Sequence, residues 1–136
     1  MKTIDVLNNI EFKDENDEEE LEMVHIFLFL VLVDMAAWHK DRGYTMVVTD
    51  LISTEEEDIS LGRESDAHRT KRGADLRSRH MEPEHREEFK ALFNKKYEDI
   101  ASISRSDNKP RLVVEHGKGM NRHFHVALNF KYRITE

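Results

Sequence analysis

Two short stretches of the sequence carry side chains that could bind a metal ion. The stretch ESDAHRTKRGADLRSR, residues 64–79, places His68 seven positions before Asp75, and the later stretch RHFHVALNF contains His123 and His125. Zinc in catalytic sites takes three protein ligands, often histidine and carboxylate, and keeps a fourth position for water. Taken singly, each residue could be an ordinary surface or turn residue, because short motifs often occur by chance. It is their combination that favours a metal centre.

The composition limits the chemistry that such a site could use. The chain has 136 residues and no cysteine, so disulfides and thiolate ligands are excluded and any metal site must use His, Asp and Glu. The formal net charge is −7. That charge argues against a protein that coats nucleic acid, because neutralising phosphates needs a basic face. The length predicts a single domain over residues 1–136, with an acidic N-terminal arm over residues 1–20.

One apolar segment, VHIFLFLVLVDMAAWHK, could be mistaken for a targeting signal or a membrane span. Its unbroken apolar run extends only from Ile26 to Val33, which is too short to cross a bilayer as a helix. Acidic residues, DENDEEELE, precede it where a signal peptide would carry basic ones. We therefore expect a buried element, no membrane insertion, and a chain that is cytoplasmic as made.

The remaining pattern predicts an α+β fold with a small antiparallel sheet flanked by helices. The middle of the first helix is apolar nearly all round, so this helix should be central to the core. Residues 3–12 could be a short strand or an ordered arm, and the acidic run 14–20 a solvated loop or a helix start. The expected helices are 19–41 and 83–103, the expected strands 44–52, 72–78, 111–117 and 123–134, and the expected loop 53–71.

The last expected strand shows how the histidines could be presented. Side chains alternate across a strand, so one face should carry the apolar set and the other face the histidines. We expect the apolar face to belong to the core and the histidine face to be open to a metal or a substrate. Ordinary surface histidines remain an alternative. The core set is Phe124, Val126, Leu128 and Phe130, and the opposite set is His123, His125, Ala127 and Asn129.

The combined pattern resembles the LAS group of zinc metallopeptidases, which includes lysostaphin-type enzymes, D-alanyl-D-alanine carboxypeptidases and the hedgehog domain. The nearest branch is that of the carboxypeptidases and phage endolysins, whose usual motif is SxHxxGxAxD followed downstream by His-x-His. Here SDAHRTKRGAD keeps the Ser, His, Gly, Ala and Asp, with the serine one position early and the Gly-Ala pair shifted. The preceding MAAWHKDRGYTMVVTDL also looks like that branch. The resemblance implies a hedgehog-like, D-Ala-D-Ala peptidase-like fold.

The resemblance also implies roles for particular residues. His68, Asp75 and His125 would be the zinc ligands, and His123 would be the non-ligand histidine that aids catalysis. The branch places a carboxylate three positions before the last ligand, whereas this chain has Arg122 there. Glu115 on the preceding expected strand is the best substitute as general base, with a surface carboxylate as the alternative.

Substrate binding departs from the branch in a second place. The arginine that usually follows the first sheet strand is missing from TDLIS. Arg63 could take its part by clamping a substrate carboxylate through two hydrogen bonds, or it could be plain surface charge. The resemblance also places Ser65 among the substrate-binding residues.

By this resemblance the chain would be a zinc-dependent peptidase, a carboxypeptidase or endopeptidase, that cleaves peptidoglycan peptides. Its small size looks like that of a phage or prophage lysis module or a virion component. It would act on the cell wall after release, with a holin or phage particle as partner. The alternative is a non-catalytic zinc-binding module that serves as a structural or assembly component of a phage particle. A plain α+β interaction domain, with coincidental histidines, is the third possibility.

Overall fold

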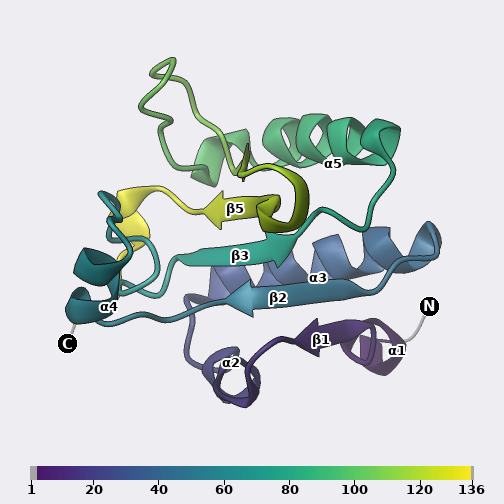
Figure 1. The fold of residues 1–136 in the computed structure, drawn as a ribbon, viewed down its shortest axis with the longest axis horizontal. Helices are drawn as coiled ribbons and strands as arrows, with labels where there is room; N and C mark the ends of the chain where they lie inside the picture. Colours follow the sequence, from purple (N-terminus) through teal and green to yellow (C-terminus); the bar gives the residue numbers. More distant parts are fainter. Residues whose placement is uncertain (1–2, 136) are drawn as a thin grey trace.

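The computed structural model describes residues 3–135 and shows an α+β fold built on one five-stranded sheet (Figure 1). The strand order is β1-β2-β3-β5-β4. β1 runs parallel to β2, and the other neighbouring pairs are antiparallel. The sheet is therefore mixed, and the purely antiparallel sheet expected from the sequence is wrong in this respect. The strands are β1 Ile10–Phe12, β2 Met46–Asp50, β3 Gly73–Arg77, β4 Val113–His116 and β5 His123–Ala127.

Two long helices cover one face of this sheet. Phe89 of α5 joins them to it, because its ring centroid lies 5.0 Å from that of Trp38 in α3 and 4.6 Å from that of Phe124 in β5. Figure 1 shows α3 behind the sheet, so the face toward the viewer is the one opposite this core. The helices are α1 Thr3–Leu7, α2 Glu15–Glu20, α3 Ile26–Asp41, α4 Glu55–Ser60 and α5 Pro83–Lys96.

The apolar segment forms α3, as predicted, and is central to the core. Leu28, Leu32 and Met35 are fully buried along it. Among residues 3–135, none of the helices combines the length and the apolar character that a membrane crossing needs.

The single helix expected over residues 19–41 is instead two helices with a turn between them. The side chain of Asp14 accepts a hydrogen bond from the Asn16 backbone and caps α2. The ring of His25 accepts one from the Phe27 backbone and caps α3. Each cap satisfies an otherwise unpaired N–H group at a helix start. The acidic run is thus a short helix, and the long helix begins at Ile26.

The N-terminal segment belongs to the folded body. Its first part forms α1 and β1, and Val6 and Ile10 are buried in the core. Asn9 ties it further to α3 and the start of β2, because its side-chain amide donates to the carbonyl oxygens of Ala36 and Tyr44. Residues 3–20 of the expected acidic arm are therefore part of the sheet and its packing, and residues 1–2 of it lie outside the described residues.

Further boundaries also differ from the sequence expectation, and the helix expected over 83–103 ends at Lys96. The last strand stops at Ala127, and the Asn129 side chain caps a short 3₁₀ turn that follows. Phe130 is consequently 63% exposed, so its predicted place in the core is wrong. The expected loop 53–71 contains α4, which begins at a reciprocal cap between Thr54 and Glu57.

The packing of Phe89 generates a first prediction. Phe89→Ala should lower the free energy of unfolding by about 3–5 kcal/mol, because it leaves a cavity between both long helices and the sheet. Leu92→Ala, on the exposed side of the same helix, should cost under about 1 kcal/mol. Urea denaturation followed by circular dichroism measures both. Equal losses would contradict the described packing.

Candidate metal centre

The strand register places Asp75 and His125 side by side. They are directly opposed on β3 and β5, so their side chains project from the same face of the sheet. Ala74, Leu76, Phe124 and Val126 alternate with them and are fully buried. Asp75 and His125 therefore lie on the face opposite the helices.

His68 reaches the same place from the turn that precedes β3. The Thr70 backbone donates to the Asp66 carbonyl oxygen and closes that turn. The turn packs so tightly on β3 that a Cβ on Gly73 would lie 2.8 Å from the Cβ of Ala67. Only glycine accommodates this approach, which explains the Gly next to the predicted ligand motif. The close packing also buries His68.

A backbone carbonyl fixes the orientation of the His68 ring. Its Nδ1 lies 2.6 Å from the carbonyl oxygen of Leu51. A carbonyl oxygen can only accept, so Nδ1 carries the proton and Nε2 is left with its lone pair. This arrangement is the usual one for histidines that ligate metals through the other nitrogen.

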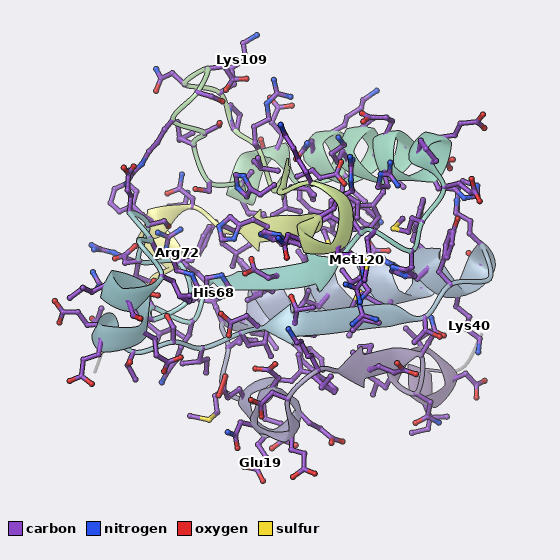
Figure 2. All side chains as sticks on the ribbon, viewed as in Figure 1. Glu19, Lys40, His68, Arg72, Lys109 and Met120 are labelled. Atoms are coloured by element: carbon purple, nitrogen blue, oxygen red, sulfur yellow. The ribbon has the colours of Figure 1, made fainter. Side chains whose placement is uncertain are left out.

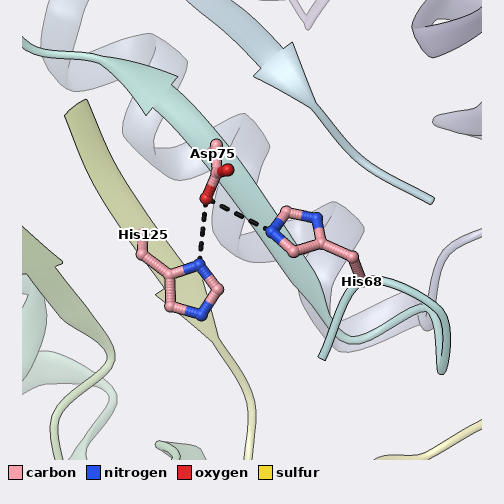
Figure 3. A group of neighbouring side chains, drawn as sticks. All are labelled: His68, Asp75 and His125. Atoms are coloured by element: carbon pink, nitrogen blue, oxygen red, sulfur yellow. Dashed lines mark hydrogen bonds and ion pairs between the residues drawn. The ribbon is translucent and has the colours of Figure 1, made fainter. Parts of the chain in front are cut away.

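Three ligand atoms converge at this point (Figure 3). His125 Nδ1 lies 2.9 Å, and His68 Nε2 3.3 Å, from Asp75 Oδ1. One ligand atom from each of the three residues lies within 4.8 Å of the others, so the group could hold a metal ion. Bonds of about 2.0–2.2 Å to a tetrahedral zinc would separate such atoms by roughly 3–3.5 Å. His68 Nε2 is also buried and makes no well-aligned hydrogen bond within residues 3–135, as a ligand atom would be.

The electrostatics keep the carboxylate ionised. Burial alone would raise the pKa of Asp75, but the hydrogen bond from His125 and the electrostatic attraction of the nearby His68 ring hold that pKa well below its usual range. Burial alone would lower the pKa of His68, but Asp75 more than offsets it and the pKa is raised. A cation is therefore favoured between these groups, as a proton or as a metal ion.

Arg63 borders the centre and is already paired with protein carboxylates. Its guanidinium lies 2.5 Å from Asp50 and 3.1 Å from Asp58, and 3.6 Å from the second oxygen of Asp75. It therefore offsets the concentration of negative charge around Asp75. The predicted clamp on a substrate carboxylate does not fit this arrangement, because the nitrogens of the fork are engaged within the protein.

The metal group opens into a hollow of about 400 Å³, which we call the metal hollow. Its rim includes Ser65, whose hydroxyl accepts a hydrogen bond from the Ala67 backbone at 3.1 Å and is exposed. His123 and His116 also line it, and their ring centroids lie 5.8 Å apart. Ser65 and His123 thus lie beside the ligand set, and their roles in substrate binding and catalysis stay predictions.

Glu115 is not brought to the centre. It pairs across the sheet with Phe124, which faces the helices. Its carboxylate accepts hydrogen bonds from Ser78 at 2.9 Å and Lys90 of α5 at 3.1 Å, and an ion pair to Arg122 lies at 3.5 Å. Alternation along β4 therefore turns this side chain to the helix face, away from the metal hollow.

His116 was expected from the sequence either to neighbour the site or merely to be exposed. It is next to Glu115 in the strand and therefore faces the opposite way, toward the metal hollow. Its ring centroid lies 6.1 Å from that of His125. The alternation of β4 could have indicated this residue, but only once the register with β5 was known.

Comparisons of the chain with models of protein families, with curated proteins and with solved structures found no match. The roles of these residues therefore depend on the geometry of the site and on the motif resemblance.

The ligand assignment predicts that only substitutions of the ligand histidines remove the metal ion. His68→Ala and His125→Ala should each abolish stoichiometric zinc uptake, because two protein ligands do not form a closed set. His85→Ala removes a histidine that contacts the Tyr44 hydroxyl away from the site and should leave uptake intact. Elemental analysis after gel filtration of zinc-treated protein measures the stoichiometry. Full zinc in His125→Ala would overturn the ligand assignment.

The raised pKa of His68 predicts a pH dependence of the metal-free protein. A histidine whose pKa is higher in the folded state stabilises fully below about pH 6.5, the unfolded value, and this stabilisation is lost as pH rises through the folded value. The free energy of unfolding should therefore decline above about pH 6.5 in wild type, and less so in His68→Gln. Urea denaturation across this range tests it. Parallel pH profiles would contradict the coupling to Asp75.

Proposed function

We propose that the chain is a zinc-dependent peptidase that cleaves peptidoglycan peptides. The observation that carries the proposal is the convergence of His68, Asp75 and His125 at the floor of a solvent-open hollow that two further histidines line. A structural zinc site is usually closed by four protein ligands, whereas three ligands facing a hollow leave room for a substrate. The motif resemblance to the LAS peptidases supplies the peptide substrate and a hedgehog-like fold.

A divalent ion at this site would supply a water of lowered pKa and polarise a substrate carbonyl. The chain's own proton carriers would be His116 and His123. Burial, followed by the nearby His125 and His123, lowers the pKa of His116, so this ring is neutral at neutral pH and can accept a proton. His116 thus replaces Glu115 as the proposed general base. His123 would hold the developing negative charge on the carbonyl oxygen.

The site face offers room for an extended substrate. A second hollow of about 320 Å³ shares Ser65, His116 and His125 with the metal hollow and continues toward the segment 102–106. Ser102, Ile103 and Ser104 line this part of the hollow. A peptide lying across the sheet could therefore contact both sides of the metal centre, as a peptidase requires. Delivery to a cell wall by a phage particle or with a holin belongs to this proposal.

The second candidate is a non-catalytic zinc-binding module of a phage particle. The position of Glu115 favours it, because its carboxylate is held between Ser78 and α5 and cannot serve the metal hollow. Arg122 likewise occupies the place where the resembling branch has its acid. The two candidates share the metal site and differ in whether the histidines transfer protons.

Digestion of purified peptidoglycan separates the two candidates. Wild type with zinc should release defined peptides, identified by mass spectrometry, and a chelator should stop the release. His116→Ala and His123→Ala should keep zinc yet slow the release by about 100-fold or more, as loss of acid–base catalysis does. His85→Ala serves as the matched control. No release from walls of several chemotypes by zinc-loaded protein would favour the non-catalytic module.

A further inference from the structure

A third hollow, on the other side of the metal hollow, is lined mainly by basic side chains. Its volume is about 340 Å³, and it shares Arg63, Asp75 and His123 with the metal hollow. We call it the cationic hollow. Its further basic residues are Lys13, Arg77, Arg79 and Arg122.

The sheet register explains why these residues meet beside the metal group. Arg77 lies two residues after Asp75 on β3, opposite His123 of β5, so its side chain projects from the site face. Arg79 continues from β3, and its guanidinium donates to the Met120 carbonyl oxygen. Lys13 directly follows β1, and Arg122 directly precedes β5. Three separate segments therefore bring positive charge to one place, beside Arg63.

The positive charge of this hollow is not neutralised by its own carboxylates. The hollow has five Lys or Arg residues against Asp50 and Asp75. Both carboxylates already face Arg63, at 2.5 Å and 3.6 Å. Within residues 3–135, Lys13 and Arg77 have neither a hydrogen bond nor an ion pair from their side chains, and Arg122 lies 3.5 Å from Glu115.

Such a local excess of positive charge attracts anions. Like charges that are gathered on one face repel one another, and the cost is offset when an oxyanion accepts their hydrogen bonds. The chain as a whole has a formal net charge of −7, so the local excess of positive charge in this hollow is opposite in sign to the net charge. Guanidinium groups are suited to this task, because their planar forks match the oxygens of phosphate and carboxylate.

We propose that the cationic hollow is a subsite for a multiply charged oxyanion, such as a phosphate group or paired carboxylates, on the ligand that spans the metal centre. A single carboxylate is satisfied by one arginine fork, whereas Lys13, Arg77, Arg79 and Arg122 together suit a higher charge. The subsite would fix the ligand's direction along the groove, with its acidic end on the His123 side. This inference rests on the proposed function only in treating the two hollows as parts of one binding groove.

Titration of the metal-free protein with inorganic phosphate, followed by ¹H–¹⁵N NMR at constant ionic strength set with chloride, tests the subsite. Saturable shifts should cluster at Arg77, Arg79 and Arg122. Arg77→Gln and Arg122→Gln should each weaken binding by about tenfold, as loss of a charge-assisted contact does. Arg133→Gln removes the same charge outside the cationic hollow and should bind phosphate as wild type does.

Two further probes identify the source of the oxyanion. A tricarboxylate that competes with phosphate would assign the subsite to clustered carboxylates, and phosphate binding without such competition would assign it to phosphate. Acetate, which carries one charge, should bind weakly in either case. Linear, unsaturable shifts, or equal weakening in Arg133→Gln, would overturn the subsite.

Failure of this inference can be distinguished experimentally from failure of the proposed function. Zinc stoichiometry and peptide release can be measured on the same preparations. Wild type that binds zinc and releases peptides but does not bind phosphate would overturn the subsite alone. Phosphate binding that depends on Arg77, in a protein that releases no peptide, would overturn the peptidase alone.

Discussion

The site depends on one largely buried carboxylate, that of Asp75. A carboxylate in this position would be strongly destabilising by itself, because burial favours its neutral form. Here His125 and His68 approach one oxygen, at 2.9 Å and 3.3 Å, and Arg63 lies 3.6 Å from the other. The same contacts that keep Asp75 ionised orient two imidazoles toward a common point. Stability of the fold and geometry of the metal centre are therefore achieved by the same set of interactions.

The two faces of the sheet have different roles, because one packs against the helices and the other carries the candidate site. One face carries the apolar residues that pack against α3 and α5, with Phe89 at their junction. The other carries the ligand group, the metal hollow into which this group opens, and the cationic hollow beside it. Figure 2 shows His68 near the start of β3 and Met120 near the opposite end of the site face, so the groove extends along the strand direction. A rigid sheet backed by two helices is suited to holding polar groups at fixed separations.

Much of this arrangement could be predicted from the sequence, and the misses have physical causes. The α+β class follows from local patterns, and the motif resemblance implied the grouping of His68, Asp75 and His125. The roles of Glu115 and His116 could not be told apart, because adjacent strand residues exchange faces with a one-residue change of register. The parallel pairing of β1 with β2 depends on long-range packing. Arg63 appeared as free charge because its partners Asp50 and Asp58 come from the preceding segments.

X-ray absorption spectroscopy of the zinc-loaded protein tests the central claim most directly, because it reports the ligands around the ion itself. We expect scattering from two imidazole rings per zinc, with nitrogen and oxygen neighbours at about 2.0–2.2 Å, and from one imidazole in His68→Ala at high zinc. We also expect no change in His85→Ala. A spectrum without imidazole scattering, or with the same two rings in His68→Ala, would contradict the assignment of His68, Asp75 and His125 as the metal centre.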